Sequence, residues 1–357
     1  MRKVRFGIVG TGRISDWVLK GAVLEPRFEA VAVCSRTPEK AEAFALKHGI
    51  PNTFTDIDRM ASDPSVDAVY IGTPNDTHHD IAIRCMDHGK HVLCEKPLAS
   101  NALEVREMIA AAKRNGVVLM EAMISTLSPN FRMIQEKLGT LGKPLHYSGT
   151  FCQFSSKHDK LQAILAGKDP GPVPSSFNPD CSGGALMDIG IYPIYPMVTL
   201  FGKPKGVKAD VTTLKVPVSD GSMKAIDIQG IVLFGYDGMS AQAMYSKIAD
   251  SRLRTEISCE GGILSLDQIH ITRQVDFIPC GAPTSGRSSG PAVEDITVPC
   301  DPDEYLCEFR EFIDVLESGR LESVNNCLGN SLAVAETMDE IRRQGGIVFP
   351  ADPIPLP

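Results

Sequence analysis

The sequence lacks three features that mark broad classes of function. It has no run of about 18 apolar residues, the length that spans a bilayer, and it passes from Met1-Arg2-Lys3 directly into a strand-like segment. It contains no lysine or arginine run and has a formal net charge of −8, so we expect neither nucleic acid nor a membrane as a partner. Its ten cysteines form no C-x-x-C pair, so we predict no metal site. These absences favour a cytoplasmic protein that binds small molecules.

The first third of the chain has the pattern of a parallel sheet with crossover helices, because short β-branched segments alternate with helical ones. We predict strands over 4–9, 29–34, 68–71, 91–94 and 117–121, and helices over 13–24, 38–48, 78–88 and 102–115. With 357 residues, the chain is long enough for a second domain with its own core.

After residue 123 the pattern changes to alternating strands with fewer helices between them, as in a mixed or antiparallel sheet. We predict strands over 146–154, 226–234 and 255–259, helices over 304–318 and 328–344, and loops over 155–183 and 280–293, of which the first is a candidate active-site lid. The predicted fold class is therefore α/β. A Rossmann dinucleotide-binding domain spans 1–122, and an α+β domain with a mixed, mostly antiparallel open sheet spans 123–357 and serves substrate binding and oligomerisation.

A glycine-bearing turn follows the first predicted strand and opens the first predicted helix, with the sequence Gly10-Thr11-Gly12-Arg13-Ile14-Ser15. Gly10 allows a tight turn, Gly12 lets the backbone approach a pyrophosphate, and the helix N-terminus supplies N–H donors and partial positive charge. Ser15 stands where a third glycine is usual and is small enough to keep the helix near the sheet. We predict that Gly10, Gly12, Arg13 and Ile14 bind a dinucleotide.

The second predicted strand ends in Cys34-Ser35-Arg36, where NAD-binding folds place a carboxylate for the ribose hydroxyls. A hydroxyl and a guanidinium instead suit a 2′-phosphate. Ser35 and Arg36 therefore favour NADP as the cofactor, with NAD possible. A solvated loop arginine is the alternative.

Two further segments end predicted strands, where ligands of open α/β sheets bind. They supply the remaining candidate cofactor-binding residues, which are Thr73, Pro74, Asn75, His78, Glu95 and Lys96. Outside that context, the first segment would be an ordinary turn with a helix cap, and the lysine an ordinary surface residue.

These motifs, together with Gly-Gly-x-x-x-Asp-x-Gly-x-Tyr over residues 183–192, appear in the order found in one family. The sequence resembles the Gfo/Idh/MocA oxidoreductases, and its tyrosine at position 192 is similar to the branch of dihydrodiol dehydrogenase, xylose dehydrogenase and glucose-fructose oxidoreductase. The resemblance implies that Lys96, Asp188 and Tyr192 are catalytic. Asp188 and Tyr192 are four residues apart, so in a helix they would face the same way.

The resemblance also implies hydride transfer between a nicotinamide and a carbinol or carbonyl carbon of a sugar, polyol or vicinal diol. An acid/base group must move the hydroxyl proton. Tyr192 could do so beside an ammonium such as Lys96, since a free tyrosine has a pKa of about 10. Lys96 could equally bond the substrate itself, and Asp188 would balance the lysine charge.

Two alternatives stay open. One is a lyase, epimerase or glycosidase that retains its dinucleotide and oxidises the substrate transiently, and the other is a non-catalytic NADP-binding sensor. An oligomer, most simply a homodimer through the outer face of the C-terminal sheet, is expected from fold analogy and from the apolar residues 231–234.

Overall fold

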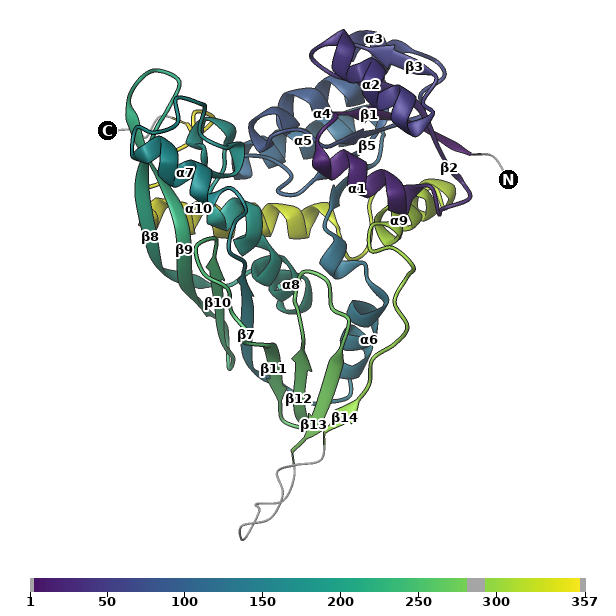
Figure 1. The fold of residues 1–357 in the computed structure, drawn as a ribbon. Coiled ribbons are helices and arrows are strands. Elements are labelled where there is room, and N and C mark those ends of the chain that lie inside the picture. The colour runs from purple at the N-terminus through teal and green to yellow at the C-terminus, as the bar shows by residue number, and fades with distance from the viewer. Residues whose placement is uncertain (1–2, 281–292, 354–357) are drawn as a thin grey trace. The chain divides into compact units, whose positions relative to one another are not determined.

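The computed structural model describes residues 3–280 and 293–353. The chain divides into two compact units (Figure 1). Unit 1 comprises Met1–Leu127, Asp301–Ala335 and Ala351–Pro357, and unit 2 comprises Ser128–Cys300 and Glu336–Pro350. Most of the predicted loop over 280–293 lies outside the described residues.

Unit 1 contains a six-stranded parallel sheet in the order β3-β2-β1-β4-β5-β6. Its strands are β1 Val4–Val9, β2 Phe28–Cys34, β3 Asn52–Phe54, β4 Ala68–Ile71, β5 His91–Glu95 and β6 Leu119–Ala122. Its helices are α1 Arg13–Ala22, α2 Pro38–His48, α3 Ile57–Ser62, α4 His78–Asp87, α5 Ala102–Asn115 and α9 Leu306–Glu317. The strand order reverses between β1 and β4, where the crevice of a doubly wound sheet binds ligands. The predicted Rossmann fold is confirmed.

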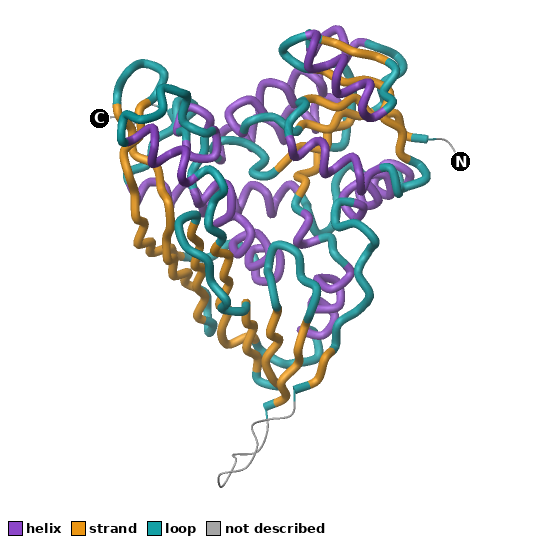
Figure 2. Tube along the Cα trace, viewed as in Figure 1, coloured by secondary structure: helices purple, strands orange, loops and turns teal. Residues whose placement is uncertain are grey.

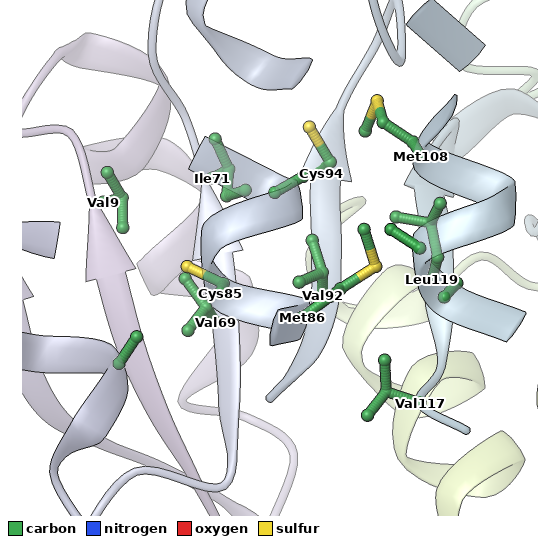
Figure 3. Packing of buried hydrophobic residues seen from close by; sticks show 14 of the residues in the cluster. Val9, Val69, Ile71, Cys85, Met86, Val92, Cys94, Met108, Val117 and Leu119 are labelled. Carbon is green, nitrogen blue, oxygen red and sulfur yellow. The ribbon is translucent and has the colours of Figure 1, made fainter. Parts of the chain in front are cut away.

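The two faces of this sheet have separate cores, because successive strand residues point to opposite sides. On one face Val9, Ile71 and Cys94 pack with residues of α4 and α5 (Figure 3). On the other face Phe6 and Phe28 contact Phe309 of α9, with ring centroids 5.4 and 5.1 Å away.

Residues 301–335 therefore belong to unit 1, although they follow the second sheet in sequence. The predicted domains, 1–122 and 123–357, were each one continuous segment. In the structure unit 1 also contains residues 301–335, because the aromatic face of α9 has its partners on β1 and β2. Helix α10, Leu328–Gly345, contributes its first part to unit 1 and its remainder to unit 2.

Unit 2 contains an eight-stranded sheet in the order β14-β13-β12-β11-β7-β10-β9-β8. Its strands, labelled in Figure 1, are drawn in orange in Figure 2. All neighbouring pairs are antiparallel except β7 and β10, so the predicted mixed, mostly antiparallel sheet is confirmed. The strands are β7 Pro144–Cys152, β8 Gly206–Pro217, β9 Met223–Gly235, β10 Ser240–Ser246, β11 Thr255–Cys259, β12 Gly262–Leu266, β13 Val275–Pro279 and β14 Glu294–Asp295.

Three helices of unit 2 were not among the predicted helices. They are α6 Pro129–Leu138, α7 His158–Leu165 and α8 Ile191–Phe201, preceded by a turn of π-helix over Leu186–Gly190. Helix α7 and two short 3₁₀ turns, Ser175–Phe177 and Pro179–Cys181, lie in the segment predicted as a loop. The prediction of a loop over 155–183 missed this helix, because the proline and glycine content of the segment is typical of loops.

Pro179–Phe201 is the one candidate span in the described residues, by length and composition, with a mean hydropathy of 1.3. Asp180 and Asp188 interrupt the segment, so it contains no continuous run of about 18 apolar residues. The structure buries 72% of its apolar window, as expected for a core helix.

Candidate active site

The glycine turn of unit 1 has the geometry that a dinucleotide requires. Gly10 has φ +100°, and a Cβ there would lie 2.4 Å from the carbonyl oxygen of Gly72, so only glycine fits between β1 and β4. A Cβ on Gly12 would meet nothing within 4 Å, and no side chain caps α1 at this residue. The N–H groups of Arg13 and Ile14 are therefore open to an anion.

Ser15 confirms that a small residue was needed at the third glycine position. It is fully buried, and a Cβ on Gly72 would approach its Oγ to 2.8 Å. The close packing of α1 on the sheet is therefore kept, and the residues present fit a bound dinucleotide.

The residues predicted to select the cofactor lie beside this turn. Ser35 Oγ is 3.3 Å from Thr11 Oγ1, which joins the end of β2 to the glycine turn. Arg36 is exposed and forms no ion pair with any residue that the structure describes. Its guanidinium is available to an anionic group on a ribose.

His78 ties together the two loops that follow β4 and β5. It is fully buried. Its Nε2 lies 2.9 Å from the carbonyl oxygen of Thr73, and its Nδ1 lies 3.0 Å from the carbonyl oxygen of Pro97. Burial lowers the pKa of His78, so the neutral ring donates one hydrogen bond at a time. This geometry gives His78 a part in positioning Thr73, Pro74 and Lys96.

Lys96 follows β5 and lies among three buried carboxyl groups. The hydroxyl of Tyr70 donates to Glu95 at 2.7 Å, because both residues point to the sheet face that α9 covers. Glu308 reaches the same place from α9, and Glu121 accepts from the backbone N–H of Leu98 at 2.9 Å.

Burial raises the pKa of each of these glutamates, to about 7 for Glu121, and the nearby charge of Lys96 opposes the rise. Lys96 is thus the cation that faces three acids of unit 1.

In unit 2 the glycine pair before the π-helical turn makes room for a buried carboxylate. Gly184 has φ +117°, and a Cβ there would lie 2.2 Å from Oδ1 of Asp227 on β9. The other oxygen of Asp227 accepts from the N–H of Leu186 at 2.6 Å. Asp227 therefore anchors the start of the helix that carries Asp188 and Tyr192.

Asp188 forms an ion pair with Lys247, the residue that follows β10. The Asp188 side chain is 39% exposed, whereas that of Lys247 is 3% exposed. The aspartate therefore pairs with a buried lysine of its own unit.

Tyr192 is half-buried in an aromatic cluster at the end of β7. Its ring centroid is 5.3 Å from that of Phe151 and 5.8 Å from that of His270, and these two rings stack at 4.1 Å. Residues 151 and 245 are paired on the parallel strands β7 and β10. Asp188 and Tyr192 thus both contact residues at the ends of these neighbouring strands.

Sequence reasoning missed Glu308, Lys247, Asp227, Phe151 and His270. None belongs to a motif, and each reaches its partner from a distant segment, so no local pattern could have found it. Among the described residues no group of three or more His, Cys, Asp or Glu could hold a metal ion.

Comparison with known proteins found two matching domain models and relatives that align over nearly the full length of this chain. The model of the "Oxidoreductase family, NAD-binding Rossmann fold" (GFO_IDH_MocA) matches residues 4–123, and that of the "GFO/IDH/MocA C-terminal domain" matches residues 132–265. Scyllo-inositol 2-dehydrogenase (NADP(+)) IolU of Bacillus subtilis (strain 168) is 41% identical over 98% of this chain and 99% of its own. Trans-1,2-dihydrobenzene-1,2-diol dehydrogenase of Sus scrofa is 31% identical over the same shares.

Among solved structures, levoglucosan dehydrogenase in complex with NADH and levoglucosan has a TM-score of 0.81 at 20% identity, covering 97% of this chain and 98% of that chain. At this identity the likeness concerns the fold.

Proposed function

Since the chain belongs to the Gfo/Idh/MocA family of oxidoreductases with an NAD-binding Rossmann fold, we propose that it is an NADP-dependent dehydrogenase or reductase of a sugar, cyclic polyol or vicinal diol. The observation that carries the proposal is its full-length similarity to two dehydrogenases whose named substrates share a chemistry. Scyllo-inositol and dihydrobenzene-diol are both six-membered rings with vicinal secondary hydroxyl groups.

In this proposal unit 1 binds the cofactor. The uncapped first turn of α1 and the glycines at 10 and 12 hold the pyrophosphate, and Arg36 pairs with a 2′-phosphate. Thr73, Pro74 and Asn75 at the end of β4, and Glu95 and Lys96 at the end of β5, lie at the strand ends where the nicotinamide is expected.

The bound nicotinamide supplies the chemistry of hydride transfer. The residues of the chain have to bind the alcohol and move its proton. We assign the proton at the substrate oxygen to Tyr192, and Lys96 provides the positive charge that favours the phenolate or donates to that oxygen. Asp188, held by Lys247, accepts a hydrogen bond from a substrate hydroxyl.

Reduction of NADP⁺ and NAD⁺ by a panel of cyclic polyols, sugars and vicinal diols tests this function, followed at about 340 nm, the absorbance of the reduced nicotinamide. We expect turnover with at least one ring that bears vicinal hydroxyls, and a large but measurable fall in kcat in Asp188→Asn. Tight retention of the dinucleotide, with conversion of a substrate but no net absorbance change, would instead indicate the lyase or epimerase class. Binding of NADP(H) without turnover of any substrate would indicate a sensor.

We further propose a cytoplasmic homodimer. None of the ten cysteines, all of them in the described residues, forms a disulfide, which suits a reducing compartment. Strand β9 buries Val232 and Phe234 but leaves Ile231 52% and Leu233 53% exposed, so one face of the sheet presents apolar side chains. A second copy would cover them in an isologous contact.

A further inference from the structure

Lys247 is a buried cation in unit 2, and three neighbouring groups contact its ammonium. Its Nζ is ion-paired with Asp188, lies 3.4 Å from the carbonyl oxygen of Ser176 and is 4.4 Å from the ring centroid of Phe177. The backbone N–H of Lys247 donates to the carbonyl oxygen of Ile228, and its carbonyl oxygen accepts from the backbone N–H of Ser155. The segments that contain these two residues therefore fix the backbone of Lys247. A lysine that only solubilised the surface would need none of these contacts.

The charge balance around Lys247 indicates that Asp188 is its counter-ion. A buried ammonium is costly unless it is paired, so one carboxylate must remain ionised beside it. The other acid nearby, Asp227, is committed to the N–H of Leu186, and burial raises its pKa to about 6. Lys247, Arg342 and Tyr245 face Asp227 as well, and only Asp188 forms an ion pair with Lys247 among the described residues. Asp188 is the partly exposed member of the ion pair, with 39% of its side chain exposed.

We infer that Lys247 is a positioning residue for the reaction, which fixes Asp188 in one orientation as an ionised carboxylate that only accepts hydrogen bonds. The inference rests on the proposed role of Asp188 in binding a substrate hydroxyl. Loss of Lys247 removes the ion pair that orients the aspartate, so orienting the substrate then costs more entropy in the reaction.

A double-mutant cycle separates this role from simple packing. We expect Lys247→Met to fold, to bind NADP(H) as the wild type does and to lower kcat by about 10- to 100-fold, because one oriented hydrogen bond is lost. Lys247→Arg, which retains the charge, should recover most of that loss. The double variant Lys247→Met/Asp188→Asn should have the kcat of Asp188→Asn alone, since residues that act as a unit are not additive.

Stability gives a second readout. Asp188→Asn leaves the buried ammonium without a carboxylate, so it should melt at a lower temperature than the double variant, which removes both charges. Lys205→Met is the matched control, because the Lys205–Asp237 pair is exposed and far from any proposed role in the reaction. It should leave kcat and the melting temperature unchanged.

The outcomes distinguish this inference from the proposed function. Wild-type kcat in folded Lys247→Met, or a double variant markedly slower than Asp188→Asn, overturns the positioning role while leaving Asp188 catalytic. Wild-type kcat in Asp188→Asn overturns the proposed role of Asp188, and this inference with it. If Lys247→Met alone does not fold, the double variant still decides between a kcat equal to that of Asp188→Asn and a lower one.

Discussion

At the residue scale, unit 1 surrounds one lysine with acids that resist ionisation. Glu95, Glu121 and Glu308 come from β5, β6 and α9, and Lys96 is the cation that all three share. A single positive charge cannot balance three carboxylates in a buried site, so protons have to make up the difference near neutral pH.

Glu121 gives this arrangement a measurable pH dependence. Burial raises its folded pKa to about 7, so the folded state holds a proton that the unfolded state has released, and stability falls as the pH rises from about 4.5 to about 7. Between pH 5 and pH 8 the loss is about 2.5 kcal/mol. We expect Glu121→Gln, which cannot ionise, to remove that part of the pH dependence in urea unfolding.

The control for this measurement is Glu29→Gln, a change at an exposed glutamate of β2. It should follow the wild-type pH dependence. An equal slope for wild type and Glu121→Gln would show that Glu121 is ionised throughout.

Tyr192→Phe removes only a hydroxyl and leaves the ring contacts with Phe151 and His270. If Tyr192 moves the proton, kcat should fall by about 10² to 10⁴-fold, with little change in cofactor affinity. Lys96→Met should also lower kcat, and the double variant should be little worse than the poorer single one. Near wild-type kcat in Tyr192→Phe would make Lys96 the preferred proton carrier.

Arg36→Ala tests the choice of cofactor. We expect tighter binding of NADP(H) than NAD(H) by the wild type, and loss of that difference in the variant, because the guanidinium pairs with the 2′-phosphate. Fluorescence titration of both cofactors measures it. Arg59→Ala, at an exposed arginine of α3, is the matched control. Unchanged NADP(H) affinity in Arg36→Ala would contradict the assignment.

At the element scale, the π-helical turn Leu186–Gly190 depends on the strands beneath it. Gly184 leaves space for Asp227, whose carboxylate binds the first turn of the helix, and a Cβ on Gly190 would lie 3.0 Å from the ring of Tyr245. The glycines of this motif are therefore required by packing on β9 and β10. That packing sets the positions of Asp188 and Tyr192.

Gly184→Ala should consequently destabilise the protein by about 2 to 5 kcal/mol, through backbone strain at positive φ plus the clash with Asp227. Gly221→Ala is the matched control, since it has φ +81° but nothing within 4 Å of the added Cβ. It should show the strain alone, about 1 to 2 kcal/mol. Equal losses in urea unfolding would mean that the Asp227 contact accommodates a methyl group.

At the scale of the whole molecule, the two compact units are each assembled from segments far apart in the chain. On β9 of unit 2, the exposed apolar residues Ile231 and Leu233 lie on one face of the sheet.

Light scattering at micromolar concentration tests the proposed dimer. We expect the wild type to have about twice the 38.6 kDa mass of one chain. Leu233→Lys places a charge on the apolar face, so its mass should shift toward that of the single chain, 38.6 kDa. Leu253→Lys changes a leucine that is 65% exposed outside β8, β9 and β10, and should leave the mass unchanged. A wild-type protein of 38.6 kDa only would contradict the proposal.

Local patterns in the sequence determined the parallel sheet and its glycine turn. Strands β1 and β4 and helices α2 and α5 begin and end at the predicted residues, because period-2 and period-3.6 patterns and the glycines after the helices are local signals. Short or irregular elements such as β3 and α7 escaped prediction because they carry little periodicity.

Only the tertiary structure decided the partners of the motif residues. The sequence itself places Lys96, Asp188 and Tyr192 in motifs, but which charge each one faces depends on segments that fold back from far along the chain. Glu308 reaches β5 because the aromatic face of α9 packs on the sheet. Lys247 reaches Asp188 because β10 lies beside β7 and β9, beneath the helix. Long-range packing sets these contacts, and no local pattern encodes it.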